Sequence, residues 1–175
     1  TEGGAHSNDI FGSPGTPETQ ASYVVEMFTQ AKAANVRVLI WFMLYNPPPD
    51  VYPYENGLVN RNDPPERKLA FFTYQQMVEQ MADASYDREL AGSELGAPEM
   101  HAYRFVKSNG AALYVAWMNP VNTDKAATLT VRGKRAVVYD IHTNTRTVAD
   151  GDDGRSDGNL SVGVGWRPLL IEILQ

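Results

Sequence analysis

The sequence predicts an α/β segment followed by an all-β segment, with the change of pattern near residue 90. Before that point, apolar residues recur at helical spacing on either side of one strongly apolar run, which is typical of alternating helices and strands. After it come short runs of alternating apolar and polar residues, separated by Gly, Asn and Asp. We therefore expect two domains, residues 1–90 and 91–175, joined by the Gly-, Ser- and Pro-containing stretch 90–98.

Composition excludes several classes of protein. With 43% hydrophobic and 21% charged residues, the 175-residue chain can bury a core. Its net charge of −6 argues against a nucleic-acid or anionic-membrane partner, since both favour a basic surface. The longest apolar run, residues 38–45, is far shorter than the ~20 residues that cross a bilayer. The absence of cysteine excludes disulfides, thiolate nucleophiles and Cys-ligated metal sites, and it leaves the cellular compartment open.

A first helix is predicted to begin after Thr16. Thr16 suits the N-cap position, Pro17 the first helical position, and Glu18 the positive end of the helix dipole. Asn35 can adopt the left-handed conformation that ends a helix. One apolar face recurs at helical spacing, formed by Ala21, Val24, Val25, Phe28 and Ala31.

Residues 36–45 (VRVLIWFMLY) predict a strand buried on both faces, because the run is apolar almost throughout rather than alternating. A short buried helix is the alternative, but the β-branched and aromatic content and the following Asn-Pro-Pro-Pro favour a strand. Residues 47–54 then form a stiff, proline-rich loop at the carboxyl end of that strand.

A second helix is predicted to open at Asp63-Pro64-Pro65-Glu66, with Asp63 as cap and Glu66 at the capping-box position. Its expected buried face consists of Phe71, Tyr74, Val78 and Met81.

The second half predicts short antiparallel strands in a sandwich or small barrel. Ser108-Asn109-Gly110 is a strong hairpin signal between the first two strands. The expected strands are residues 101–107, 111–118, 127–131, 136–141, 145–148, 160–164 and 169–174.

The candidate site residues lie at the start of the chain and around the apolar strand. Glu2 precedes Gly3-Gly4, and small residues beside a carboxylate let a ligand approach closely. An exposed acid near the chain end is the alternative interpretation of Glu2. Trp41, with Tyr45 and Asn46, lies at or beyond the carboxyl end of the strand, where barrel enzymes carry their sites. Aromatic faces beside amides and carboxylates suit sugar rings, although core packing is an equally simple role for Trp41.

The order Thr-Glu-Gly-Gly, helix, VRVLIWFMLYN, loop, helix and antiparallel β domain resembles the C-terminal end of a clan A glycoside hydrolase. The resemblance implies the last βα units of a (β/α)8 barrel followed by an antiparallel β-sandwich. It also implies that Glu2, at the end of one barrel strand, is the nucleophile of a retaining enzyme, and that Trp41, on the next strand, stacks against the sugar. Glu2 and the Trp41 ring are therefore expected to lie near one another at the carboxyl ends of neighbouring parallel strands. Tyr45, Asn46 and His6 are then expected to contact the substrate, a carbohydrate with β-linkages, with neither metal nor organic cofactor.

The sequence departs from this family in two respects. A complete barrel needs ~250 residues, and retaining hydrolysis needs a second carboxyl group as acid/base. The family's acid/base Glu follows an Asn, and no Asn-Glu pair occurs in the chain. We therefore expect a piece of a longer protein, inactive and unstable as an isolated monomer, that is completed by an N-terminal barrel segment or a neighbouring subunit. A non-catalytic carbohydrate-binding or structural subunit is the alternative.

Two weaker patterns are interpreted structurally. Asp150, Asp152, Asp153 and Asp157 resemble a calcium loop, but the spacing is not that of an EF-hand, so a solvated hairpin tip is expected. His6, His101 and His142 lack paired metal-ligand spacing, and no metal site is predicted.

Overall fold

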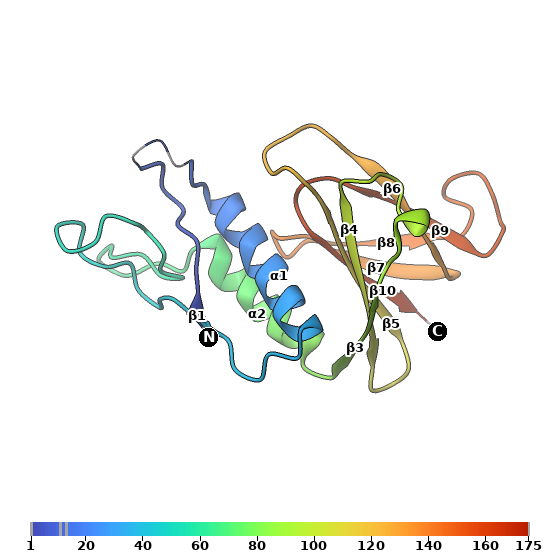
Figure 1. Ribbon diagram of the computed structural model, residues 1–175, viewed down its shortest axis with the longest axis horizontal. Coiled ribbons are helices and arrows are strands. Elements are labelled where there is room, and N and C mark those ends of the chain that lie inside the picture. Colours follow the sequence, from blue (N-terminus) through green and yellow to red (C-terminus); the bar gives the residue numbers. More distant parts are fainter. Residues whose placement is uncertain (1, 11, 13, 175) are drawn as a thin grey trace. The chain divides into compact units, whose positions relative to one another are not determined.

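The computed structural model describes residues 2–10, 12 and 14–174. The chain divides into two compact units, one ending at Glu79 and the other beginning at Gln80 (Figure 1). This division lies before residue 90 because a strand that the sequence did not reveal, β3 (Ala84–Glu89), pairs with the β strands that follow it. Within the described ranges, no helix is long and apolar enough to cross a membrane.

The first unit contains β1 (Glu2–Gly3), α1 (Pro17–Ala33), β2 (Ile40–Trp41) and most of α2 (Leu69–Met81). β1 and β2 are parallel neighbours. The two helices lie side by side (Figure 1), with the rings of Phe28 and Tyr74 edge to face at 5.0 Å. The helix–strand–helix order is the one that the sequence pattern predicts, and β1 precedes it.

Helix α1 confirms its prediction in detail. Thr16 is the N-cap, and its Oγ1 accepts a hydrogen bond from Thr19 N at 3.1 Å. Thr19 Oγ1 accepts in return from Thr16 N at 2.8 Å, so a threonine takes the capping-box place usually filled by Glu or Gln. Asn35 has φ +55°, the left-handed conformation expected after the helix. The apolar face packs inward, since Ala21, Val24 and Val25 are fully buried.

The strand predicted over residues 36–45 is much shorter. Only Ile40–Trp41 is strand, and Val38, Ile40 and Leu44 are more than half exposed. The run has the composition of a strand with neighbours on both edges and cover on both faces. Among the described residues, the one strand that pairs with β2 is the two-residue β1, so regular pairing extends no further.

The start predicted for the second helix is also wrong, because α2 begins at Leu69 rather than Pro64. Residues 60–66 form a closed turn instead, in which Asn60 Oδ1 accepts hydrogen bonds from the backbone N–H of Asn62 and Glu66. Such local side-chain bonds compete with helix formation. The buried face of α2 also differs from the prediction: Ala70, Thr73 and Met77 are buried, with the predicted Met81, while Val78 is half exposed.

The second unit consists of two antiparallel sheets. The larger has six strands in the order β3-β4-β5-β10-β7-β8, and the smaller pairs β6 with β9. All seven predicted strands are present within two residues of their expected ends, and Gly110 adopts φ +84° in the predicted hairpin. The elements are η1 (Gly92–Glu94), β4 (Met100–Lys107), β5 (Ala112–Met118), β6 (Ala127–Arg132), β7 (Arg135–Tyr139), β8 (Thr145–Ala149), β9 (Asn159–Val164) and β10 (Leu169–Leu174).

One hydrophobic core joins the two sheets. The small sheet contributes alternate residues, Leu129 and Val131 from β6 and Leu160, Val162 and Val164 from β9. The large sheet faces them with alternate side chains that include Met100, Ala116, Val138 and Ile171. The alternation of apolar and polar residues in the sequence therefore arises because every second side chain of each sheet faces the core.

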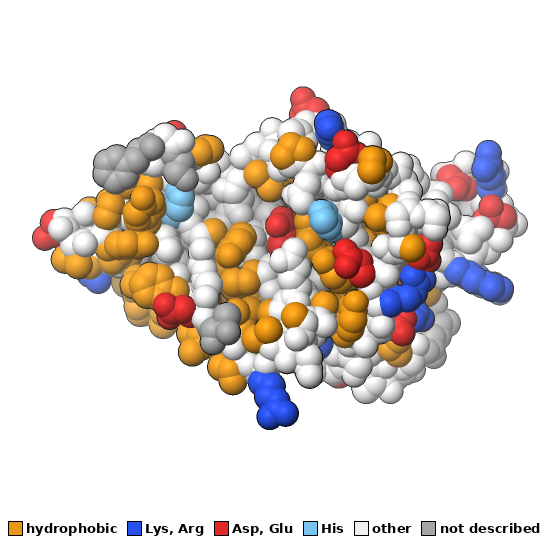
Figure 2. Space-filling model, in the orientation of Figure 1, with side chains coloured by type: hydrophobic (Ala, Val, Ile, Leu, Met, Phe, Trp, Pro, Cys, Tyr) orange, Lys and Arg blue, Asp and Glu red, His pale blue; other side chains and the backbone are white. Residues whose placement is uncertain are grey.

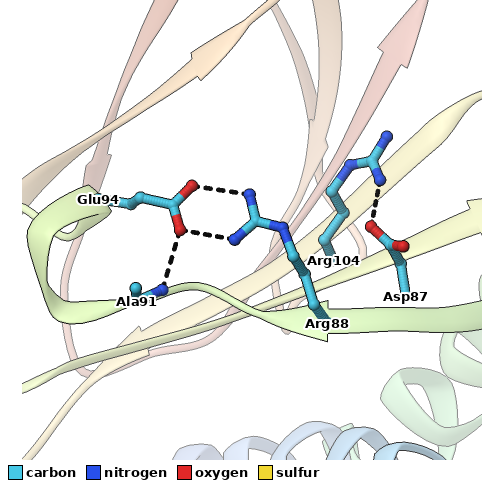
Figure 3. A network of polar contacts seen from close by, with 5 residues as sticks. All are labelled: Asp87, Arg88, Ala91, Glu94 and Arg104. Atoms are coloured by element: carbon cyan, nitrogen blue, oxygen red, sulfur yellow. Dashed lines mark hydrogen bonds and ion pairs between the residues drawn. The ribbon is translucent and has the colours of Figure 1, made fainter.

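Polar contacts fix the edge where β3 lies. Arg88 binds both carboxylate oxygens of Glu94, at 2.6 and 2.7 Å, and Glu94 also accepts from Ala91 N at 3.0 Å (Figure 3). These hydrogen bonds lower the pKa of Glu94 to about 2. Arg104 of β4 pairs with Asp87 of β3 in the same view. The network joins β3 to the turn that follows it and to its neighbouring strand.

Candidate functional site

The register of β1 and β2 brings the two predicted site segments together. Glu2 lies opposite Ile40 and Gly3 opposite Trp41, and Phe42 N donates to Gly3 O at 2.8 Å. In parallel strands, residues paired in this way point to the same face, and successive residues alternate. Glu2 therefore shares a face with Ile40, whereas Trp41 shares the other face with Gly3.

Helix α1 covers the face of Gly3 and Trp41. A Cβ on Gly3 would lie 2.5 Å from Met27 Sδ, and the Trp41 ring meets the Tyr23 ring edge to face at 6.2 Å. The exposed Glu2 side chain thus points to the side of the strands away from α1. The sequence predicted the proximity of these segments but not the opposite orientation of their side chains.

Trp41 is a core residue in this structure. Its side chain is 7% exposed, and its indole Nε1 donates to Asn56 O at 3.0 Å. A ring held in this way has little free face for a sugar. The core role, which the sequence left open beside the stacking role, accounts for the contacts of Trp41.

Asn46 and Tyr45 differ in their surroundings. Asn46 is buried, and its Oδ1 accepts from Gly57 N at 2.9 Å and from Lys68 Nζ at 3.3 Å, so its side chain holds the loop closed. Burial lowers the pKa of Lys68 to about 8, while the nearby Glu55 charge opposes that shift. Tyr45 is half exposed and pairs with Val59 through its backbone.

A row of aromatic rings runs from the end of β2 into the loops. Phe42 lies 6.4 Å from Tyr52, Tyr52 lies 5.1 Å from Tyr54, and Tyr54 lies 5.2 Å from His6 (centroid distances). His6 Nδ1 is 2.7 Å from Asn8 O. Tyr52 and Tyr54 lie in the proline-rich loop that the sequence predicts over residues 47–54. The sequence pattern did not identify Phe42 as part of this row, nor the contact between Tyr54 and His6.

A polar pocket of about 390 Å³ opens beside these rings. The residues that carry polar groups into its lining are Asn8, Asn46, Tyr52, Tyr54, Glu55, Asn60, Arg61 and Asn62. Gln20, fully buried on α1, connects the surrounding segments, since its Nε2 donates to the carbonyls of Ala5, Glu55 and Gly57. Sequence periodicity could not reveal Gln20, because a glutamine on a helix is ordinarily a surface residue.

A second, apolar groove of about 620 Å³ lies between β2 and α2. Ile40, Leu44, Phe71, Tyr74 and Val78 are among its lining residues, which include most of the face predicted to be buried on α2. Figure 2 shows hydrophobic side chains gathered over the first unit on the face in view.

The described residues contain no group of three or more His, Asp or Glu side chains that could hold a metal ion. In the Asp-rich loop, Asp150 accepts from the backbone N–H of Asp157 and Gly158, and Asp152 from Ala149 N. These carboxylates shape the loop through hydrogen bonds to its own backbone. The expected hairpin tip is wrong, because the loop connects β8 of the larger sheet to β9 of the smaller sheet.

Comparison with solved structures finds glycoside hydrolases that share the fold of this chain. A family 39 glycoside hydrolase from Bacteroides cellulosilyticus matches 99% of the chain with a TM-score of 0.73 at 14% identity. The catalytic domain of the family 30 xylanase C from Talaromyces cellulolyticus matches with a TM-score of 0.62 at 14% identity over 100% of the chain. A family 51 arabinofuranosidase from Xanthomonas axonopodis matches with 0.63 at 10% identity over 99%.

The chain spans 33% of the first of these structures and 40% of each of the other two. No family model and no curated protein matches the sequence. At these identities the likeness concerns the fold, and the chain has a glycosidase-related fold with two helices and antiparallel sheets.

Proposed function

We propose that this chain is the C-terminal part of a retaining clan A glycoside hydrolase. β1, α1, β2 and α2 are then the last two βα units of a (β/α)8 barrel, and the second unit is its β-sandwich. The likeness to enzymes of three glycoside hydrolase families over nearly the whole chain supports this assignment, as does the share of those structures that the chain spans.

Glu2 is the proposed nucleophile, and the register of β1 and β2 is the observation that carries this role. Helices cover the outside of a (β/α)8 barrel, and active sites lie at the carboxyl ends of its strands. Because Gly3 and Trp41 face α1, the side chain of Glu2 faces the opposite side, which would be the interior of the barrel. Gly3 and Gly4 follow directly, so no bulky side chain from the next two residues limits the approach of a substrate.

In this mechanism a Glu2 carboxylate oxygen attacks the anomeric carbon as the bond to the leaving oxygen breaks. A second carboxylic acid, supplied by a segment outside this chain, protonates the leaving oxygen and then deprotonates the water that hydrolyses the glycosyl ester. Retaining enzymes hold the two carboxyl groups about 5–5.5 Å apart. The substrate is an oligo- or polysaccharide, and its linkage is β by family resemblance.

The aromatic contact to the sugar is assigned to Phe42 rather than Trp41. Phe42 directly follows β2, and its backbone N–H still donates to Gly3 O at 2.8 Å. If the alternation of β2 continues to Phe42, its side chain shares the face of Ile40 and Glu2. Its ring also begins the row that continues through Tyr52. Trp41 supports the strand from the α1 side.

Azide rescue tests the role of Glu2. In protein expressed from its complete reading frame, Glu2→Ala should lower turnover of aryl β-glycosides by several orders of magnitude. Azide should restore it and yield a glycosyl azide of inverted anomeric configuration, because the anion occupies the space of the missing carboxylate. Glu99→Ala, at an exposed glutamate of the second unit, is the matched control. A retained-configuration azide, or full activity in Glu2→Ala, would assign the nucleophile elsewhere.

The polar pocket favours one second candidate, a non-catalytic carbohydrate-binding subunit, because the pocket's lining does not include Glu2. Sugar binding that survives in Glu2→Ala, with no glycosidase activity in the unmodified protein, would support this alternative.

A further inference from the structure

We propose that the polar pocket is a second sugar subsite, which takes a neutral residue of an oligosaccharide distant from the bond that is cleaved. This inference rests on the proposed function and specifies its substrate as a chain rather than a single sugar. The pocket's volume of about 390 Å³ falls within the range of small-ligand sites.

The chemistry of the lining suits a neutral sugar. Tyr52 and Tyr54 are half-buried and tilted by 50° at 5.1 Å, so they provide apolar surface for the C–H face of a ring. Arg61 supplies donors and Glu55 acceptors for hydroxyl groups. The two opposite charges of the lining balance, which favours an uncharged ligand over an acidic one.

Both walls of the pocket are held in place before any ligand binds. On one side, Asn8 Nδ2 donates to Pro53 O at 3.0 Å, and its Oδ1 accepts from Glu55 N at 3.0 Å. On the other side, Glu66 Oε2 accepts from the side-chain amides of Asn60 and Asn62, at 2.9 and 2.8 Å. A preorganised site of this kind binds with a smaller loss of conformational entropy.

A neighbouring carbonyl fixes the orientation of the Arg61 side chain and uses only one of its donor groups. Its Nε donates to Asn46 O, and its terminal nitrogens donate to no group in the part of the chain that the structure describes. The fork of the guanidinium is therefore available to adjacent sugar hydroxyls. Because the ring row passes from Phe42 through Tyr52 to Tyr54, one oligosaccharide could extend from the end of β2 to this pocket.

The test measures affinity against chain length in the complete protein carrying Glu2→Gln, which blocks turnover. The probes are xylo-, arabino-, gluco-, galacto- and manno-oligosaccharides of one to six residues, followed by calorimetric titration of the series that binds. We expect affinity to increase with length until the pocket is filled. Adding Tyr54→Ala should lower affinity for the long members about five- to tenfold, as for the loss of one aromatic contact, and should leave the shortest members unaffected.

Matched variants separate the ring from the fold. Tyr54→Phe should retain the length dependence, and Tyr86→Ala, at a 40% exposed tyrosine of β3, should retain all binding. Should Tyr54→Ala not fold, Asn62→Ala at the pocket rim is expected to weaken the long members about threefold. Equal affinities in all variants, or no bound oligosaccharide, would overturn the subsite. If azide rescues Glu2→Ala but Tyr54→Ala does not change oligosaccharide affinity, the subsite alone is rejected. If Tyr54→Ala lowers the affinity but azide does not rescue Glu2→Ala, the nucleophile assignment alone is rejected.

Discussion

At the scale of single residues, the candidate site depends on close backbone approaches that only glycine permits. A Cβ on Gly57 would lie 2.2 Å from Asn46 N and 2.4 Å from Tyr45 C, both of which are backbone atoms that cannot move aside. A Cβ on Gly3 would meet Met27 Sδ at 2.5 Å, and that side chain is flexible. Similar distances therefore predict different costs.

Gly57→Ala is expected to reduce the free energy of unfolding by about 3 kcal/mol, and Gly3→Ala by about 1 kcal/mol. Gly92→Ala serves as control, because no atom lies within 4 Å of its added Cβ. Urea denaturation of the three variants measures the difference. Equal losses for Gly57→Ala and Gly3→Ala would contradict the close approach at Asn46.

Glu26 on α1 predicts a pH-dependent stability. Burial raises the pKa of its carboxyl from the ordinary value of 4.5 to about 7, and its Oε1 is buried without a hydrogen-bond partner. The protonated form is favoured in the folded state, so the stabilising contribution is complete below pH 4.5 and is lost as the pH rises to 7. Since the side chain is partly exposed, the loss is on the order of 2 kcal/mol.

Glu26→Gln should therefore be more stable than the unmodified protein at pH 8 and nearly equal to it at pH 4. Unfolding free energies in urea at the two pH values test this. An unchanged difference between the proteins at both values would show that Glu26 does not titrate with folding.

At the scale of elements, the sequence predicted α1 and seven strands because each has a clear period and clear ends. It did not predict β3, whose residues are Ala-Ser-Tyr-Asp-Arg-Glu and exposed after the first, so no apolar alternation marks it. For residues 36–45 the sequence predicted a longer strand than the structure contains. Their composition is typical of a strand with more neighbouring strands than the described residues provide.

The same limit applies to the site. The order of motifs predicted that Glu2 and Trp41 come from adjacent strands, and the register confirms it. It could not predict which face α1 covers, and that face decides that Trp41 packs inward. The residues of the polar pocket come from segments up to 54 positions apart, from Asn8 to Asn62. No local sequence pattern could therefore predict that they line one pocket.

The ion-pair network of β3 predicts a local effect on an edge strand. Glu94→Gln removes the charge from the bidentate contact with Arg88, so the amides of β3 and η1 should exchange hydrogen faster at pH 7. Glu99→Gln, which alters the exposed pair with Lys125, is the control and should leave β3 unchanged. Equal exchange of β3 in both variants would mean that backbone pairing alone holds this edge. Hydrogen exchange followed by mass spectrometry resolves the two regions.

At the scale of the whole molecule, exposed apolar surface is concentrated around β2. Val36, Val38, Ile40 and Leu44 are 38–62% exposed. They adjoin the short strand β2, one edge of which has no strand neighbour among the described residues. Exposed apolar edges of this kind promote association. We therefore predict that the isolated 175-residue chain forms oligomers, and that Val38→Lys with Ile40→Lys reduces them. Light scattering tests this, and a monodisperse 19.4 kDa particle with cooperative melting would contradict it.

In the proposed mechanism, Glu2 forms a covalent bond to the sugar. The most direct test is covalent labelling. The complete protein is treated with a 2-deoxy-2-fluoroglycoside that carries a good leaving group, and the labelled residue is located by proteolysis and tandem mass spectrometry. We expect one fluoroglycosyl ester per chain, located on Glu2 and absent from Glu2→Gln. An ester on any other carboxylate, with Glu2 unmodified, would contradict it.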